Sequence, residues 1–191
     1  MKKTELLIPV GNKECLLAAI HNGADAVYLG GKKFGARAYS NNFDNQEMIE
    51  AIKLCHLYGV KIYVTVNTMI YNEEINEVLN YLNFLNANNV DAVIMQDNGL
   101  IELARKYIPD LEIHVSTQAH NHNEPAIKHY KELGCTRVVF DRESSLEAIN
   151  NIKTPIEKEV FVYGALCICY SGNCLFSALN GGRSANRGMC V

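Results

Sequence analysis

Short apolar runs recur along the chain, separated by segments with the spacing of amphipathic helices. The runs are rich in β-branched residues and nearly continuous in apolarity, which is typical of parallel strands covered by helices. They fall at residues 6–10, 26–29, 62–66, 92–95, 113–115, 137–140 and 160–163. The pattern therefore predicts seven parallel strands.

The segments between the runs carry apolar residues three and four positions apart, which is the repeat of one helix face. They predict helices at residues 13–22, 45–58, 73–87, 99–107, 124–133 and 145–150. Asp44 stands before the second of these helices as an N-cap residue, and Gly23 and Gly59 follow helices where a left-handed residue is favoured. Helices alternating with strands in this way predict an α/β protein.

Repeated strand–helix units close either into an eight-stranded barrel or into an open doubly wound sheet. The units share one pattern of helix cap, short step and strand, seen at residues 23–28, 89–94 and 134–139. This regularity favours a TIM-like (β/α) barrel with its strands in sequential order. Because only seven strands are predicted, we expect the barrel to be incomplete, with the edge of the first strand open or covered by a neighbouring chain. Residues 1–191 would then be the N-terminal part of a (β/α)-barrel domain that ends within a cysteine-rich segment, residues 167–190.

The overall charge and hydropathy of the chain limit its partners. A formal net charge of −3 does not predict nucleic-acid binding through phosphate neutralisation alone, although it leaves room for a local basic pocket. The first residues lack the pattern of a secretory signal, and no apolar stretch has the length of a membrane-spanning helix. We expect a cytoplasmic protein without a membrane partner.

Polar residues directly follow several predicted strands. In a (β/α) barrel the carboxyl ends of the strands meet at one edge, where active sites lie. The candidate substrate-binding residues at this edge are Asn67, Gln96, Ser116, Gln118 and Arg142. Any one of them can simply cap a helix or satisfy a loop amide, whereas the set suggests a pocket for a polar small molecule or an extruded base. Arg142 is the best candidate for gripping a carboxylate or phosphate, because its guanidinium donates from a fork.

The seven cysteines are unevenly distributed. Three scattered ones, expected to be small core residues, are Cys15, Cys55 and Cys135. Four others crowd the glycine-rich end of the sequence: Cys167, Cys169, Cys174 and Cys190. Thiolates in such a stretch suit a soft metal or an iron–sulfur cluster, whereas zinc sites more often use C-x-x-C pairs, and buried free thiols are the alternative. Cys169 would point away from Cys167 if the last strand continued to this point.

Other catalytic motifs are missing from the sequence. His114, His120 and His122 do not form a zinc-binding helix motif, and His114 is expected to be a hydrogen-bonded core histidine within a strand. The stretch 170–172 is not the G-x-S-x-G nucleophile turn. Catalytic residues therefore stay unassigned.

Six blocks of the sequence resemble the collagenase-like peptidase family, family U32. They are residues 5–12, 23–31, 36–38, 64–68, 114–118 and 159–190, so the resemblance extends along the whole chain. It implies a TIM-like barrel carried on a longer chain. Many members of the family are called peptidases or collagenases. Others are oxygen-independent hydroxylation proteins that act on tRNA uridine with prephenate, on ribosomal RNA cytidine or on ubiquinone precursors.

The same resemblance implies a cofactor. The hydroxylation relatives hold a 4Fe–4S cluster with four cysteines, and the matching positions in this sequence are Cys167, Cys174 and Cys190. The fourth ligand is expected beyond Val191. We therefore expect residues 1–191 alone to bind no cluster and to be inactive.

Three functions remain open at this point. An iron–sulfur-dependent, oxygen-independent hydroxylation enzyme acting on an RNA base or a quinone precursor would explain both the thiols and the polar edge. A peptidase is supported by the family naming, and a non-catalytic binding module is the third alternative. Hydroxylation is favoured because it gives the thiols a role. The expected partners are a small-molecule or RNA substrate, prephenate among the candidates, and other subunits in a homo- or hetero-oligomer.

Overall fold

The computed structural model describes residues 4–165 and 167–190. It contains a seven-stranded parallel sheet in the order β1-β2-β3-β4-β5-β6-β7. The strands are β1 (Leu7–Pro9), β2 (Ala26–Gly30), β3 (Lys61–Val66), β4 (Ala92–Met95), β5 (Ile113–Val115), β6 (Arg137–Val139) and β7 (Glu157–Glu159). The sequential order confirms the predicted repetition of strand–helix units and differs from the reversed order of a doubly wound sheet.

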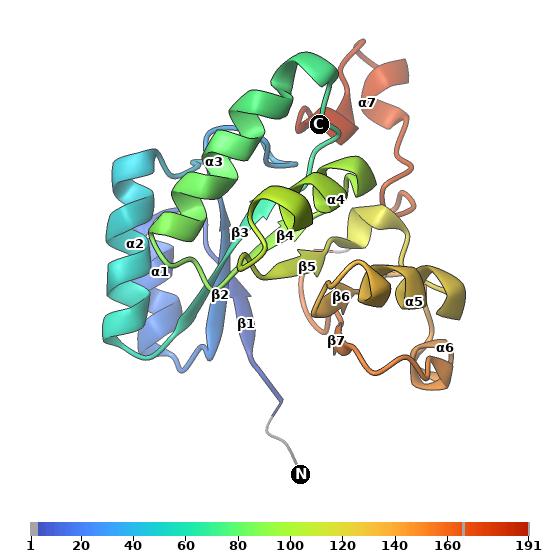
Figure 1. Ribbon diagram of the computed structural model, residues 1–191, viewed down its shortest axis with the longest axis horizontal. Helices are drawn as coiled ribbons and strands as arrows, with labels where there is room; N and C mark the ends of the chain where they lie inside the picture. The colour runs from blue at the N-terminus through green and yellow to red at the C-terminus, as the bar shows by residue number, and fades with distance from the viewer. Residues whose placement is uncertain (1–3, 166, 191) are drawn as a thin grey trace.

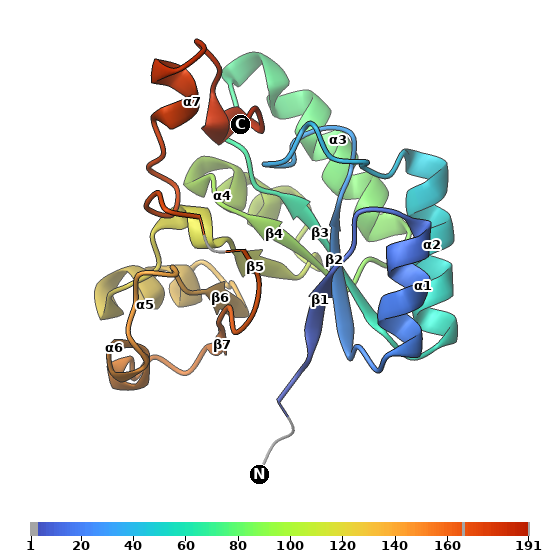
Figure 2. The same cartoon turned by 180° about the vertical axis from the view of Figure 1, so that it is seen from behind.

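The sheet curls into a half-barrel with helices around its outside (Figures 1 and 2). The helices are α1 (Lys13–His21), α2 (Asn45–Leu57), α3 (Ile75–Ala87), α4 (Asn98–Tyr107), α5 (Glu124–Glu132), α6 (Leu146–Asn151) and α7 (Phe176–Leu179). Three short 3-10 helices are η1 (Asn72–Glu74), η2 (Thr117–Ala119) and η3 (Ala185–Arg187). The fold is therefore α/β and TIM-like but incomplete. Within the described ranges, no helix has both the length and the apolarity needed to cross a membrane.

The main core lies between the outer face of the strands and the helices. Val64 and Val93 are fully buried there, in one cluster with Leu82 of α3 and Ile101 of α4. Burying an aliphatic side chain of this size contributes about 1.5–3 kcal/mol. A smaller cluster on the inside of the half-barrel is formed by Ala26, Tyr63, Ala92 and Ile94. The two clusters explain why the strands are apolar on both faces.

Local signals fix the ends of several helices as predicted. Asp44 Oδ1 accepts the backbone N–H of Glu47 at 2.9 Å, and Glu47 Oε2 accepts the backbone N–H of Asp44 at 2.8 Å, which together form a capping box. Gly23 and Gly59 follow α1 and α2 with φ of 85° and 69°, the left-handed region that glycine adopts without strain. These contacts keep the connections short and the strands in sequence.

The seventh strand lies earlier in the sequence than predicted. β7 is Glu157–Glu159, and its register pairs Arg137 with Glu157 and Val139 with Glu159. This register places two carboxylates beside the Arg137 guanidinium, which an apolar strand could not do. The predicted apolar run, residues 160–163, continues beyond the paired strand and is exposed. The position predicted for the seventh strand was therefore wrong, whereas the number of strands and their parallel direction were predicted correctly.

The scattered cysteines are only partly in the core. Cys55 and Cys135 are 0% and 1% exposed, as expected. Cys15 is exposed. The side of α1 that faces the core carries Leu16, Ala19 and Ile20, three and four residues apart, and Cys15 lies outside that stripe. The expectation that Cys15 is a core residue was therefore wrong.

Candidate functional site

Four of the predicted edge residues form one hydrogen-bond network at the carboxyl ends of β3, β4 and β5. Gln96 Nε2 donates to the backbone oxygen of Asn67 at 2.7 Å and to Gln118 Oε1 at 3.2 Å. Asn67 Nδ2 donates to Ser116 Oγ at 3.5 Å, and the same oxygen accepts the backbone N–H of Gln118 at 3.2 Å. The structure thus brings together side chains from three separate loops. We call these four residues the amide network.

Burial and a hydrogen bond from the loop after β2 hold the amide network in place. Gln96 and Ser116 are 8% and 1% exposed. Asn67 Oδ1 accepts the backbone N–H of Ala36 at 3.0 Å, which ties the long loop after β2 to the network. A primary amide has two donor hydrogens and an acceptor oxygen, so these groups can fix the loops and still offer hydrogen bonds to a ligand. Their role in substrate binding remains a prediction.

Arg142, the fifth predicted edge residue, contacts the cysteine-rich segment instead of the amide network. Its Nη2 donates to the backbone oxygen of Cys169 at 2.9 Å. The neighbouring Glu143 accepts the backbone N–H of Ser171 at 3.0 Å, and this hydrogen bond helps to hold the pKa of Glu143 below its usual range against the opposing effect of burial. The loop after β6 therefore anchors the first half of the cysteine-rich segment.

Three thiols lie together in that half. Cys169 interacts with the thiols of Cys174 and Cys167, and the hydrogen bond that the Cys169 thiol donates to Cys174 raises the pKa of Cys169. Backbone hydrogen bonding from Phe176 lowers the pKa of Cys174, with a further contribution from Cys169. Because β7 ends at Glu159, the chain at Cys169 is not extended strand. The conditional expectation that Cys169 points away from Cys167 therefore does not apply.

The second half of the segment docks on the loops after β2 and β3. Arg187 donates from Nη1 and Nη2 to the two carboxylate oxygens of Glu74, at 2.6 Å each. Its guanidinium also lies over the ring of Tyr71, 4.3 Å from the centroid. The backbone oxygen of Gly188 accepts the N–H of Ala38 at 2.8 Å. The cysteine-rich segment therefore crosses the C-terminal edge from β6 to β2, and the ribbon around α7 lies at that end of the sheet in both views (Figures 1 and 2).

The donor types of this segment, thiols with a backbone N–H donor beside them, are those that hold 4Fe–4S clusters in other proteins. Three of its four thiols, Cys167, Cys169 and Cys174, interact with one another, and a backbone amide donates to Cys174. Beside the loop, Arg142 Nε and His120 Nε2 are buried without a hydrogen-bond partner among the described residues. In the same residues, no three His, Cys, Asp or Glu side chains are arranged to hold a metal ion. The predicted ligands Cys167, Cys174 and Cys190 therefore do not form a closed set within this part of the chain.

Two contributors to the site were not identified from the sequence. Asn121 is fully buried, and its Nδ2 donates to the backbone oxygens of Ser116 at 2.7 Å and Val139 at 2.8 Å, which joins the ends of β5 and β6. Glu74 carries the ion pair with Arg187 described above. Neither could be recognised in the sequence, because Asn121 lies in a loop without a motif and Glu74 looks like an ordinary first-turn acid of a helix.

His114 is a core histidine, as predicted, and lies on β5 just before Ser116 of the amide network. Its side chain is fully buried on the inside of β5, and Nε2 lies 3.3 Å from Glu112 Oε1. Burial lowers the pKa of His114, although Glu112 acts in the opposite direction. Its ring makes an edge contact with Tyr63, with 4.6 Å between centroids. These contacts support a structural role.

Comparison with known proteins gives one consistent family. The model of peptidase family U32 matches residues 11–191. The chain is 42% identical to tRNA hydroxylation protein P1 of Bacillus subtilis, covering 99% of this chain and 45% of that protein. It is 40% identical to the 23S rRNA 5-hydroxycytidine synthase of Escherichia coli, over 98% and 28% of the two chains. It is 34% identical to a collagenase of Porphyromonas gingivalis, covering 98% of this chain and 48% of that protein. The chain thus spans less than half the length of these relatives.

The solved structures show the same architecture. A U32 peptidase superposes with a TM-score of 0.67 over 83% of this chain and 67% of that chain, at 17% sequence identity. A phosphoenolpyruvate phosphomutase of Streptomyces platensis superposes with a TM-score of 0.59 at 14% identity, over 84% and 69% of the two chains. At such identities the likeness concerns the fold alone.

Proposed function

Because the chain belongs to peptidase family U32 and its relatives include tRNA and rRNA hydroxylation proteins, we propose that the full-length protein hydroxylates an RNA base. The observation that carries the proposal is the position of the cysteine-rich segment. It docks over the same strand ends at which Asn67, Gln96, Ser116 and Gln118 converge. A hydrogen-bonding surface and a group of thiols therefore share one edge of the sheet.

The amide network would bind the base. The edges of uracil and cytosine carry both donors and acceptors, and an enzyme that modifies a base takes it out of the stack to reach it. Side-chain amides can donate and accept at once, so Gln96 and Gln118 can pair with such an edge. Their mutual hydrogen bond and the bond from Gln96 to Asn67 would hold them in position before the base arrives.

The cysteine-rich segment would hold the cofactor. Cys167, Cys174 and Cys190 are the proposed cysteine ligands of a 4Fe–4S cluster, with a fourth ligand from the longer polypeptide. When bound, such a cluster supplies one-electron transfer or a Lewis-acidic iron without the need for molecular oxygen. The protein itself would hold the thiols in position and donate backbone N–H groups to them, as at Cys174. It would also keep water away from the C-terminal edge of the sheet.

A small carboxylate such as prephenate is the proposed second substrate. Arg142 is its proposed contact, because the guanidinium lies against the backbone of Cys169 and its Nε is buried without a partner among the described residues. Nη2 of the same residue stays on the backbone oxygen of Cys169. One arginine can therefore anchor the segment and still orient a carboxylate.

A peptidase is the second candidate, favoured by the 34% identity to a collagenase. The described residues contain few groups that could cleave a peptide bond. The histidines that pair there with another side chain include His56, His114 and His122. Their partners are carboxylates and, for His122, also the amide of Asn123, rather than a serine or cysteine. The same residues contain no metal-binding group that could activate water.

The experiment that tests the proposal compares RNA from a strain that lacks the full-length protein with RNA from the same strain carrying the wild-type gene. Mass spectrometry of the nucleosides should show a hydroxylated pyrimidine that disappears on deletion and returns with the gene. Purified full-length protein should not cleave gelatin. Unchanged nucleosides together with gelatin cleavage would replace the proposal by the peptidase alternative.

A further inference from the structure

The loop after β2 brings an unpaired cation to the C-terminal edge of the sheet. The loop carries three basic side chains, and two of them are already paired. Lys32 Nζ lies 3.3 Å from Asp44 Oδ2, and Lys33 forms an ion pair with Glu77. The guanidinium of Arg37 forms no ion pair or hydrogen bond with any residue in the described ranges. Arg37 is therefore the cation of this loop that is available to an anion.

The backbone on both sides of Arg37 is held by the site. The preceding residue, Ala36, donates its N–H to Oδ1 of Asn67 in the amide network at 3.0 Å. The following residue, Ala38, donates its N–H to the backbone oxygen of Gly188 in the cysteine-rich segment at 2.8 Å. Successive Cα atoms are about 3.8 Å apart. Arg37 is thus fixed between the amide network and the cysteine-rich segment.

The Arg37 guanidinium lies close to the inner surface of the half-barrel. Tyr28 of β2 is half-buried and packs against the inner cluster that contains Ala26 and Tyr63. Burial raises the pKa of Tyr28, and the positive charge of Arg37 acts in the opposite direction. Because such an interaction weakens with distance and is screened by water, the two side chains must be near each other. A ligand inside the C-terminal edge can therefore reach Arg37.

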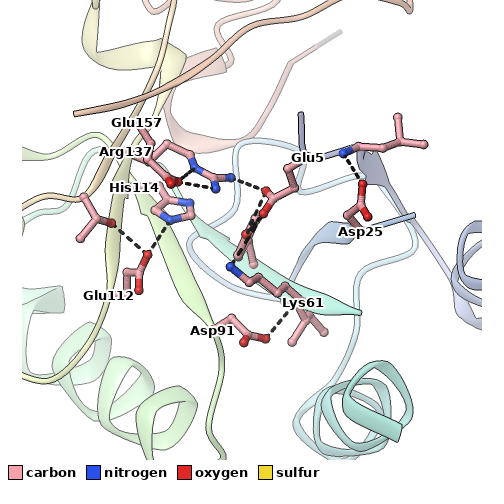
Figure 3. Close-up of polar contacts among 12 residues, drawn as sticks. Glu5, Asp25, Lys61, Asp91, Glu112, His114, Arg137 and Glu157 are labelled. Atoms are coloured by element: carbon pink, nitrogen blue, oxygen red, sulfur yellow. Dashed lines mark hydrogen bonds and ion pairs between the residues drawn. The ribbon is translucent and has the colours of Figure 1, made fainter. Parts of the chain in front are cut away.

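The other arginine inside the half-barrel is not available to an anion. Arg137 is the first residue of β6, and its Nη1 lies 2.6 Å from Glu5 Oε1. Its Nη2 lies 2.8 Å from Glu157 Oε2, and Figure 3 shows the guanidinium between these two carboxylates. The Arg137 side chain is only 8% exposed. An incoming anion would have to displace a carboxylate there, whereas at Arg37 it would not.

An extruded nucleotide brings a phosphate to the same edge as its base. Base flipping rotates the nucleotide about its backbone, so the flanking phosphates stay attached beside the base. Contacts to phosphates fix the position of a nucleic acid, whereas contacts to base edges provide sequence specificity. A guanidinium fork can donate two hydrogen bonds to one phosphate. With a net charge of −3 on the chain, RNA binding at this edge requires a local cation.

We propose that Arg37 binds a phosphate of the RNA backbone next to the base that the amide network receives. This inference rests on the proposed function, because it takes the base to lie on Gln96 and Gln118. The phosphate contact fixes the nucleotide relative to these two amides. Since the cysteine-rich segment holds the Arg37 backbone through Ala38, docking of that segment and binding of RNA support each other.

The salt dependence of RNA binding tests this contact. Fluorescence anisotropy measures binding of the full-length protein to short RNA hairpins whose single-stranded loop carries one uridine or one cytidine among purines. Arg37→Gln should weaken binding about tenfold and reduce the slope of log K against log salt by about 0.7, the value for one phosphate of a single strand. Arg37→Lys keeps the charge and should keep the slope. Lys33→Gln is the matched control on the same loop and should change neither quantity, because this lysine already pairs with Glu77.

A neutral phosphate analogue tests the contact directly. Each of the two phosphates that flank the loop pyrimidine is replaced by an uncharged methylphosphonate. One replacement should weaken binding to the wild type about tenfold and leave binding to Arg37→Gln unchanged, which is the coupling expected of two groups in contact. Equal losses in the wild type and in Arg37→Gln at both phosphates would reject the contact. An equal change of the salt slope in Lys33→Gln would reject it as well, because the loop would then attract RNA without a specific site.

The inference and the proposed function can fail separately. Wild-type protein that binds and hydroxylates RNA, with no coupling between Arg37 and either phosphate, would overturn the phosphate contact alone. Wild-type protein that binds neither hairpin would overturn both. Weaker binding of prephenate by Arg37→Gln, with unchanged affinity for RNA, would assign Arg37 to a small carboxylate and reject the phosphate contact. Circular dichroism of each variant verifies that the protein is folded.

Discussion

Arg187 and Glu74 form a two-pronged ion pair between segments that lie far apart in the sequence. Both nitrogens of the Arg187 fork lie 2.6 Å from a Glu74 oxygen, and Tyr71 lies under the guanidinium. The pair fixes the second half of the cysteine-rich segment on the last residue of η1, directly before α3. The position of Cys190 at the C-terminal edge therefore depends on a contact made three residues before it.

Replacing this arginine should loosen the segment. Arg187→Lys keeps the charge but loses the fork, so we expect a loss of about 1–2 kcal/mol of local stability. The amides of Ala38 and Met69, which donate to Gly188 and Asn186, should then exchange with deuterium about tenfold faster. Arg183→Lys in the same segment is the control and should leave both exchange rates unchanged. Equal rates in the two variants would show that the ion pair does not hold the segment.

A methyl group at Gly172 should separate the cysteine-rich segment from the amide network. A Cβ there would lie 2.2 Å from the backbone oxygen of Gln118, whereas one at Gly182 would meet nothing within 4 Å. Both glycines have positive φ, 76° and 62°, so alanine strains the backbone by about 1–2 kcal/mol at either position. Gly172→Ala should destabilise the full-length protein by at least about 1 kcal/mol more than Gly182→Ala in urea unfolding. Equal losses would place the close approach at Gly172 in doubt.

The buried His114 should make stability depend on pH. Its folded pKa lies below the ordinary value of 6.5 because of burial, so the unfolded chain binds the proton first as pH falls. The stabilisation is fully present above pH 6.5 and is lost as pH falls toward the folded pKa. It changes by up to about 1.4 kcal/mol per pH unit.

His114→Gln isolates this contribution. In urea unfolding at a series of pH values, the variant should show a smaller loss of stability below pH 6.5 than the wild type. His129→Gln, at an exposed position of α5, serves as the control for the loss of one histidine. A variant with the same pH slope as the wild type would mean that His114 is not the group responsible.

The fold and the meeting of four edge residues could be predicted because each follows from a repeated local pattern. Parallel strands all carry their carboxyl ends to one edge, so the residues after β3, β4 and β5 had to meet there. Gln96 and Gln118 are in direct contact for this reason. The order of the strands follows in the same way from the short connections between successive units.

The remaining features depend on contacts that no local pattern encodes. β7 is selected by the charge of Arg137, which lies 20 residues before Glu157, rather than by the apolar run that follows it. Arg142 follows a strand like the other candidates, yet its guanidinium is drawn to the carbonyl of Cys169. Cys15 lies among apolar neighbours in the sequence, but the helix turns it away from the core. Each of these outcomes is decided by tertiary packing.

In the proposed function, the amide network and the cysteine-rich segment form one site of RNA hydroxylation. The most direct test is the amount of hydroxylated pyrimidine in RNA from an anaerobically grown deletion strain carrying full-length variants. Gln96→Ala, which removes the hydrogen bonds to Asn67 and Gln118, and Cys174→Ser should each reduce the modified nucleoside at least about a hundredfold. Glu147→Gln, at an exposed position of α6, should restore it fully. Normal modification with Gln96→Ala and Cys174→Ser, both confirmed as folded and expressed, would show that the amide network and the cysteine-rich segment do not form a site of RNA hydroxylation.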